Sequence, residues 1–272
     1  LTEMRDKGLA FADVLKEAQR LGYAEADPTF DVEGIDAAHK LTIMASIAFG
    51  MPMQFDQAYT EGITQLTTQD IQYAEELGYR VKLLGISKKT DAGVELRVHP
   101  TLIPEKRLIA NVDGAMNAVV VKGDAVGPTL YYGAGAGAEP TASAVVADLV
   151  DIARLQGTTA EQRVAYLGYQ LNQQQALPVL PIAEVQSAYY LRLHASDKPG
   201  VMAAVTKILA DLQISIDAML QKEPADGEVE ADIVILTHLT QEKIMDAAIA
   251  SIKALPAIAG TVVKIRMEAL AR

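Results

Sequence analysis

An aspartate and a lysine four residues apart, Asp36 and Lys40, form the pair in this sequence best suited to proton transfer. Four residues along an α-helix bring two side chains to the same face, one turn apart, so the Asp36 carboxylate can fix the position of the Lys40 ammonium. A positioned ammonium can give a proton to an oxygen that is gaining negative charge. The simpler interpretation is an ordinary surface ion pair, which is the usual meaning of this spacing when it stands alone.

The residues ahead of this pair favour the chemical interpretation. Asp27 and Pro28 predict a turn, because proline fixes its own φ and moves the preceding residue away from the helical region. Gly34 stands just before the expected helix, where a larger residue would crowd whatever docks at the helix N-terminus. Acidic residues therefore gather at one helix start instead of spreading along a solvated face: Glu25, Asp31 and Asp36.

This stretch resembles the signature of homoserine dehydrogenases, and the match is long and ordered. It reads Leu-Gly-Tyr-x-Glu-x-Asp-Pro over residues 21–28, then Asp31, then Gly-Ile-Asp-x-x-x-Lys over residues 34–40. The resemblance implies reversible hydride transfer between NADP or NAD and C4 of the small-molecule substrate aspartate 4-semialdehyde, which gives homoserine.

The same resemblance implies a role for each residue of the acidic stretch. Lys40 would protonate the developing alkoxide, and Asp36 would orient Lys40 and touch the substrate hydroxyl. Glu25 would receive the substrate ammonium, and Asp31 would help to shape the site. Two further acids are interpreted differently: Asp27 as a turn residue and Glu33 as solvated.

A glycine-rich segment, Gly-Ala-Gly-Ala-Gly-Ala at residues 133–138, precedes an expected helix at residues 141–155. Its glycines lack the G-x-G-x-x-G spacing, and no βαβ unit with a ribose-binding acid follows. The segment is either a tight strand-to-helix turn or a loop that lets a ligand approach backbone N–H groups at a helix N-terminus. In homoserine dehydrogenases a matching segment lies beside the nicotinamide, so the resemblance implies a minor cofactor-facing role for Gly135, Gly137 and Glu139.

The dinucleotide-binding fingerprint of such enzymes is absent from this sequence, because no G-x-G-x-x-G follows a strand. The first residue is Leu1 instead of Met. We therefore expect that an N-terminal NAD(P)-binding domain is missing, that this domain binds most of the cofactor, and that the present chain alone is inactive. The choice between NAD and NADP and the binding of a monovalent cation both stay open at this point.

Residues 187–272 have an organisation of their own. A ferredoxin-like βαββαβ order is predicted by strands at 188–195, 214–221, 231–238 and 260–267, helices at 201–212 and 241–255, and a turn at 224–227. The D-x-P-G-V motif after the first strand resembles an ACT domain, an amino-acid-sensing module. A backbone cradle there could hold the charged ends of an amino acid at Asp197, Gly200 and Val201. The alternative is that Asp197 only caps the helix. The resemblance suggests threonine as the effector.

Apolar periodicity predicts the elements that position these residues. We expect one helix at residues 1–21, a largely buried helix at 36–49 and a short helix at 70–77. Two hairpins are expected, at residues 79–99 and at 115–132 around a two-residue Gly123-Asp124 turn. The predicted fold class is α+β: an open mixed, largely antiparallel sheet with helices on one face, followed by the ACT domain.

The chain is expected to divide into three parts. Residues 1–172 would form the substrate and catalytic domain, residues 173–186 a polar linker with prolines, and residues 187–272 the ACT regulatory domain. Hairpin edges and ACT modules usually pair, commonly with two-fold symmetry, so a homodimer or homotetramer is expected.

Composition excludes several classes of function. The 272 residues carry a net charge of −11 and a pI of about 4.9, unlike a nucleic-acid-binding protein. The absence of cysteine excludes disulfides, thiolate nucleophiles and Cys-based zinc sites, and the four histidines show no metal-ligand spacing. No apolar run is long enough to span a membrane and no signal peptide is visible, so we expect no membrane partner and a cytoplasmic location.

Three interpretations of the whole chain stay open. The first is a homoserine dehydrogenase. The second is a regulatory module that binds an amino acid without catalysis, which would not need the combination of Glu25, Asp36 and Lys40. The third is a fragment that folds and dimerises but is inactive because the nucleotide domain is absent.

Overall fold

The computed structural model of the chain describes residues 1–135, 137–159, 162–163, 168–222 and 230–270, and its central element is the long strand β3 (Gly93–Pro104). One edge of β3 pairs antiparallel with β2 (Tyr79–Thr90) along its whole length, with Tyr79 opposite Pro104 and Thr90 opposite Gly93. The first predicted hairpin is therefore confirmed, and it is longer than the sequence pattern indicated.

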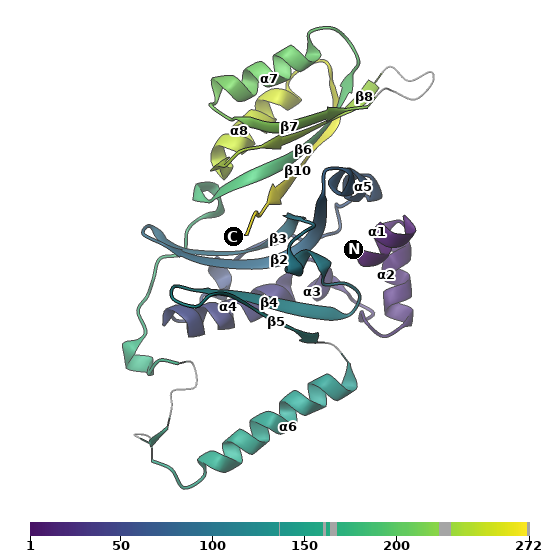
Figure 1. Cartoon of the computed structure of the whole chain (residues 1–272). Helices are drawn as coiled ribbons and strands as arrows, with labels where there is room; N and C mark the ends of the chain where they lie inside the picture. The colour runs from purple at the N-terminus through teal and green to yellow at the C-terminus, as the bar shows by residue number, and fades with distance from the viewer. Residues whose placement is uncertain (136, 160–161, 164–167, 223–229, 271–272) are drawn as a thin grey trace.

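The other edge of β3 binds three separate segments of the chain. Val94 forms a parallel bridge with Val179, from the segment predicted to be a linker. Further along, β1 (Tyr59–Thr60) pairs parallel with Arg97 and Val98. The last strand, β10 (Ile258–Met267), pairs parallel with Thr101 and Leu102. The sheet of the C-terminal part is therefore continuous with the sheet of the N-terminal part (Figure 1).

The C-terminal part has the predicted βαββαβ order, with one additional two-residue strand, β9, before its second helix. Its elements are β6 (Gln186–Ser196), α7 (Val201–Asp211), β7 (Ile216–Gln221), β8 (Glu230–Thr237), β9 (Thr240–Gln241), α8 (Glu242–Lys253) and β10. The strands are antiparallel in the order β10-β6-β8-β7, and β9 pairs with β6. Apolar residues of α7 and α8 pack on one face of this sheet, among them Val205, Leu209, Met245 and Ile252. The predicted turn at residues 224–227 lies outside the described residues.

The opposite face of the same strands is covered by the N-terminal part. Helices α1 (Thr2–Lys7) and α5 (Thr68–Glu76) pack there, with Met4, Ile71 and Ala74 in one core with Tyr190 and Leu236. Asp70, which is fully buried, accepts hydrogen bonds from Arg192 Nε and Nη2 at 2.6 and 3.0 Å. The two parts of the chain therefore share a core as well as a sheet.

The helix predicted at residues 1–21 is wrong in one respect, because it is two helices. Gly8 adopts a left-handed conformation (φ 64°) that ends α1, and α2 (Phe11–Arg20) begins after it. Glycine takes this conformation without the steric cost that a Cβ imposes, so the break falls where glycine stands.

The acidic stretch leads through the short α3 (Thr29–Val32) into α4 (Ile35–Phe49). Helix α4 packs on β2 and β3 through Ala38, Leu41 and Ala45. The prediction that α4 is largely buried is wrong for one face, because three apolar side chains there are 38–44% exposed: Ile43, Met44 and Ile47.

The second predicted hairpin is present as β4 (Met116–Gly123) and β5 (Gly127–Ala134), which form a separate two-stranded sheet. Its turn has three residues instead of the expected two, because Gly127 pairs with Gly123 and has φ 75°. Helix α6 (Ala138–Leu155) follows and stands apart from the rest of the chain (Figure 1), with no buried residue. The described single-turn 3-10 helices are η1 (Phe55–Gln57), η2 (Leu108–Asn111), η4 (Leu171–Gln173) and η5 (Ile182–Glu184).

Candidate active site

The start of α4 rests directly on β3. Gly34 is the N-cap residue of α4 and has φ 77°. A Cβ at this position would lie 2.9 Å from Val98 Cγ1. Sequence reasoning assigned Gly34 to making room for a ligand, but the structure gives a packing reason, which is the close contact of the α3–α4 turn with the sheet.

Asp36 and Lys40 are brought together as predicted. Lys40 Nζ donates to Asp36 Oδ2 at 2.6 Å, across one turn of α4. The Asp36 side chain is 43% exposed and the Lys40 side chain is 68% exposed, so the ion pair adds little to the stability of the fold. Its main consequence is to orient the Lys40 ammonium. Asp36 stands in the first turn of α4, where the helix dipole favours a negative charge.

The other two predicted acids of the site are placed by the segments just before α4. Glu25 lies between α2 and α3, where Gln19 Nε2 donates to its backbone carbonyl at 2.9 Å, and Asp31 lies on α3. Both carboxylates are exposed. Among the described residues, no hydrogen bond or ion pair joins either of them to Lys40. The structure therefore assembles the Asp36–Lys40 pair and leaves Glu25 and Asp31 open to a ligand or to solvent.

The two acids that were expected to lie outside the site behave differently from each other. Asp27 Oδ1 accepts from the backbone N–H and the hydroxyl of Thr29, at 3.1 and 2.6 Å, and these bonds lower the pKa of the Asp27 carboxyl. Its predicted turn role is confirmed. Glu33 is partly exposed to solvent, and its Oε1 also accepts from Thr64 Oγ1 at 3.2 Å.

Sequence reasoning missed the segment on which the α3–α4 turn sits, residues 59–63, which we call the platform. The backbone N–H of Glu61 donates to Val98 at 2.8 Å, and that of Ile63 donates to Val32 at 2.8 Å. A Cβ at Gly62 would lie 2.6 Å from the Val32 carbonyl oxygen. A glycine directly after an acidic residue, where two backbones meet closely, is the local signal that could have marked this segment.

The platform is tied to the C-terminal part by a buried arginine. Arg266 Nη1 donates to Glu61 Oε2 at 2.7 Å, and the Tyr59 hydroxyl donates to the same oxygen at 2.7 Å. On its other side, Arg266 donates to both carboxylate oxygens of Glu242, at 2.9 and 2.5 Å.

Tyr59 and Glu242, which are both hydrogen-bonded to Arg266, have shifted pKa values. Burial raises the pKa of the Tyr59 hydroxyl to about 12, against the opposing charge of Arg266. Burial alone would raise the pKa of Glu242, but hydrogen bonds and charge from Arg266 and Lys264 outweigh it and lower that pKa to about 2. Glu242 is therefore ionised at neutral pH.

The glycine-rich loop lies at the start of α6. Gly137 is the N-cap residue with φ 118°, and a Cβ at Gly135 would lie 2.5 Å from Asn117 Nδ2. Glu139 stands in the first turn of α6, where its carboxylate would repel a phosphate. A phosphate group is therefore disfavoured at this helix start. Among the described residues, no hydrogen bond links this loop to α4.

The predicted effector site lies at the start of α7. Gly200 is the N-cap residue with φ 93°, and no side chain caps the helix. Asp197 Oδ1 instead accepts from Gln221 Nε2 at 3.1 Å, so the alternative that Asp197 only caps the helix is wrong. The backbone N–H of Val201 donates to Lys198 at 3.3 Å.

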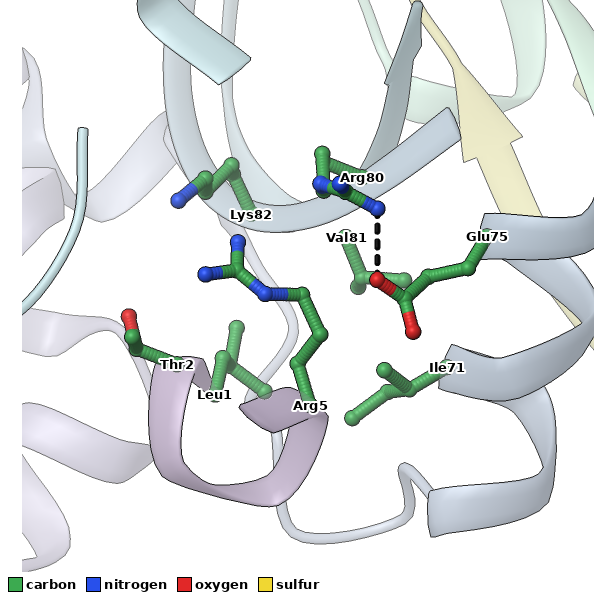
Figure 2. Close-up of a pocket in the computed structure, with 8 residues that line it drawn as sticks. All are labelled: Leu1, Thr2, Arg5, Ile71, Glu75, Arg80, Val81 and Lys82. Atoms are coloured by element: carbon green, nitrogen blue, oxygen red, sulfur yellow. Dashed lines mark hydrogen bonds and ion pairs between the residues drawn. The ribbon is translucent and has the colours of Figure 1, made fainter. Parts of the chain in front are cut away.

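A small pocket lies away from the acidic stretch, between α1, α5 and β2 (Figure 2). It is lined by Leu1, Thr2, Arg5, Ile71, Glu75, Arg80, Val81 and Lys82. Arg80 Nη1 donates to Glu75 Oε1 at 2.6 Å across it. None of the predicted site residues lines this pocket.

The described part of the chain lacks two features, a helix that could span a membrane and a cluster of metal ligands. No helix within it is long and apolar enough to cross a membrane. No group of three or more His, Asp or Glu residues within it is arranged to hold a metal ion.

Comparison with known families gives two matches. The sequence model of the family described as Homoserine dehydrogenase matches residues 1–150. The model of the ACT domain matches residues 189–257. The first match contains the Asp36–Lys40 pair, the platform and the glycine-rich loop, and the second contains α7 and α8.

Whole proteins are similar over nearly the full chain. A homoserine dehydrogenase from Pseudomonas aeruginosa is 59% identical over 270 residues, which are 99% of this chain and 62% of that protein. The crystal structure of a homoserine dehydrogenase from Thiobacillus denitrificans has a TM-score of 0.93 and 68% identity, over 99% of this chain and 61% of that one. The crystal structure of a homoserine dehydrogenase from S. aureus has a TM-score of 0.70 and 28% identity, over 99% of this chain and 62% of that one. This chain therefore spans about three fifths of the length of these relatives.

Proposed function

This chain belongs to the homoserine dehydrogenase family, and from that premise we propose that it carries the substrate-binding and proton-transferring part of such an enzyme. The proposed reaction is the reversible NAD(P)H-dependent reduction of L-aspartate 4-semialdehyde to L-homoserine. The observation that carries the proposal is the 2.6 Å pair between Lys40 and Asp36 at a helix start surrounded by further acids.

Each residue of the site has a task in this reaction. The Glu25 carboxylate binds the substrate ammonium, and Asp31 adds negative charge beside it. Asp36 holds the Lys40 ammonium toward the C4 oxygen, which gains negative charge as the carbonyl is reduced, and Lys40 donates a proton to it. In the reverse direction Lys40 draws the proton from homoserine.

A nicotinamide cofactor supplies the hydride in this reaction. The family resemblance implies that Gly135, Gly137 and Glu139 would lie at its nicotinamide end, and the carboxylate of Glu139, which disfavours a phosphate there, agrees with this. Since this chain spans 62% of the Pseudomonas aeruginosa relative, we expect turnover to require the rest of the protein and the chain alone to be inactive.

The part that matches the ACT domain is proposed to bind an amino-acid effector, with threonine as the candidate. The support is the backbone at the start of α7, where Gly200 takes the place of a side-chain cap and the N–H groups of Met202 and Ala203 have no acceptor among the described backbone hydrogen bonds, so they are open to a carboxylate. Asp197 and Val201 flank this position.

A second copy of the chain is proposed as the partner. Within the described residues, β4 and β5 pair only with each other, so each has an unpaired edge. Both faces of this hairpin expose apolar side chains, among them Val119, Val120, Leu130 and Tyr131. A two-stranded hairpin of this kind is marginally stable alone and is commonly completed by pairing across a two-fold axis.

The proposal is tested by completing this chain with the part of the Pseudomonas aeruginosa relative that it does not span, which gives the completed protein. Lys40→Ala is expected to lower kcat for homoserine oxidation by about 10²–10⁴-fold, because the proton-transferring group is lost. Lys207→Ala is the matched control. Lys207 also pairs with an aspartate four residues away, Asp211, at 3.0 Å, but it lies on α7.

Two results would count against the catalytic proposal. If Lys40→Ala retains the rate of the unmodified completed protein, Lys40 is not the proton donor. If the unmodified completed protein binds threonine but does not oxidise homoserine, the alternative of a purely regulatory module is favoured.

A further inference from the structure

Arg266 is a fully buried cation with partners from both parts of the chain. It lies on β10, and 1% of its side chain is exposed. Glu242, its partner on one side, is the first residue of α8. Glu61, its partner on the other side, lies 205 positions away in the sequence, in the platform.

The two carboxylates that bind Arg266 differ in the number of their other hydrogen-bond partners. Glu242 is also bound by Lys264 Nζ at 2.5 Å and by the Tyr189 hydroxyl at 2.8 Å, so this carboxylate has several compensating partners. Glu61 is 36% exposed, and among the described hydrogen bonds its carboxylate accepts only from Arg266 and Tyr59. Removing the charge of Glu61 therefore leaves Arg266 still paired with Glu242, whereas removing Glu242 would leave a buried cation poorly compensated.

The platform in turn fixes the start of α4. Its backbone donates to Val98 on β3 and to Val32 at the end of α3, both at 2.8 Å. Gly62 lies so close to Val32 and Glu33 that no side chain fits between them. Gly34, the N-cap residue of α4, packs on Val98 beside the Glu61 carbonyl. A displacement of the platform must therefore move the turn that precedes Asp36 and Lys40.

We propose that Arg266, acting through Glu61, is a positioning residue for the Asp36–Lys40 pair, and that it joins this pair to α8 of the ACT-matching part. The inference rests on the proposed function for the catalytic meaning of that pair. Its physical content is independent of the function: the ion pair between β10 and the platform holds the first turn of α4 in place. The net stability added by such an ion pair is small, because the cost of removing its charges from water offsets their attraction.

The test uses hydrogen exchange on this chain, read at the first turns of α4 (residues 35–40) and along α8. Glu61→Gln removes the charge and retains the shape of the side chain. We expect amide exchange at residues 35–40 to become about tenfold faster, because local opening there needs less free energy, while exchange in α8 and the melting temperature change little. Asp246→Asn is the matched control, since Asp246 binds Lys264 at 2.6 Å in the same network but does not contact the platform.

A milder variant covers the case in which Glu61→Gln fails to fold. Tyr59→Phe removes the hydrogen bond that the Tyr59 hydroxyl donates to Glu61 and the one that it accepts from Arg266 at 3.2 Å, without removing a charge. We expect amide exchange at residues 35–40 to accelerate less in this variant than in Glu61→Gln. Unchanged exchange at residues 35–40 in the folded variants, or an equal acceleration in Asp246→Asn, would overturn the proposal.

The completed protein also allows a kinetic test of the proposal. Glu61→Gln should lower kcat/KM for homoserine by about 10–100-fold, since small displacements of a catalytic group are costly. Asp246→Asn should stay within about twofold. If the completed protein has no such activity, the proposed function fails while the exchange result still decides whether Arg266 positions α4.

Discussion

His99 shows how one side chain can make the stability of this fold depend on pH. It is fully buried, its Nε2 accepts from Arg97 Nη1 at 2.7 Å, and its Nδ1 lies 3.0 Å from the Pro100 carbonyl. This geometry suits a neutral imidazole with the proton on Nδ1. Burial, with the positive charges of Arg266 and Arg97, lowers the pKa of His99 well below its usual value near 6.5.

The consequence is a loss of stability in mild acid. Below about pH 6.5 the unfolded chain takes up a proton at this histidine that the folded chain does not, so the free energy of unfolding falls as the pH falls, by up to about 1.4 kcal/mol per unit. His99→Gln should remove this contribution. Urea unfolding between pH 5 and 7 should therefore show a shallower pH dependence for the variant.

His238→Gln is the control for that measurement, because His238 is exposed and its Nε2 lies 3.9 Å from Asp217. Its pH dependence should match that of the unmodified chain. The buried carboxylate Glu242, with a pKa of about 2, loses its contribution only at much lower pH, so it does not obscure the result. Parallel pH profiles for His99→Gln and the unmodified chain would contradict the assignment.

At the scale of single elements, the turn before α4 is set by two requirements on one glycine. Gly34 needs a left-handed backbone, and its position against Val98 has no space for a methyl group. Gly34→Ala should lower the free energy of unfolding by about 1–2 kcal/mol for the backbone and by about 1–3 kcal/mol more for the clash.

Gly78→Ala separates these two costs. Gly78 has a similar φ of 79°, but nothing lies within 4 Å of the place where its Cβ would be. Chemical denaturation of both variants should show the larger loss for Gly34→Ala. Equal losses would mean that Val98 yields and that the turn is not held against the sheet.

Elements with a local signal could be predicted from the sequence. The hairpins follow from alternating residues around turn-forming residues, and the Asp36–Lys40 pair follows from the helical period. The break at Gly8 was missed because apolar spacing continues across it. The exposed face of α4 was also missed, because Ile43, Met44 and Ile47 look like core residues when no tertiary contact is known.

The link between Arg266 and Glu61 could not be predicted at all. Its two partners are 205 residues apart, and neither lies in a motif that suggests the other. The pairing of β3 with three distant segments could not be predicted for the same reason, since the register between distant strands depends on the whole fold. The residues proposed to do chemistry had a sequence signature, whereas the Arg266–Glu61 ion pair proposed to position them had none.

At the scale of the whole molecule, the β4–β5 hairpin is the surface expected to join two copies. Val119 and Tyr131 are opposite one another on one face of it, and the Tyr131 side chain is 65% exposed. Tyr131→Glu should weaken self-association by about tenfold or more in Kd, because a charge would be buried in an apolar interface.

Analytical ultracentrifugation of this chain measures that effect. Leu239→Glu is the control, because Leu239 is 70% exposed but lies between β8 and β9 in the C-terminal part. Its dissociation constant should not change. A dimer that tolerates Tyr131→Glu, or a chain that is monomeric without any substitution, would exclude the hairpin as the interface.

The edge of β3 has a consequence for the order in which the chain can acquire its structure during synthesis. On this edge of β3, Thr101 and Leu102 pair with Arg266 and Met267, about 165 residues later in the sequence, and Val94 pairs with Val179. A nascent chain emerging from the ribosome therefore carries an incomplete sheet edge until residues 266 and 267 have been made. Closing such distant contacts is slow, and an open edge is prone to pair with other chains, so this strand is where assistance from a chaperone would matter most.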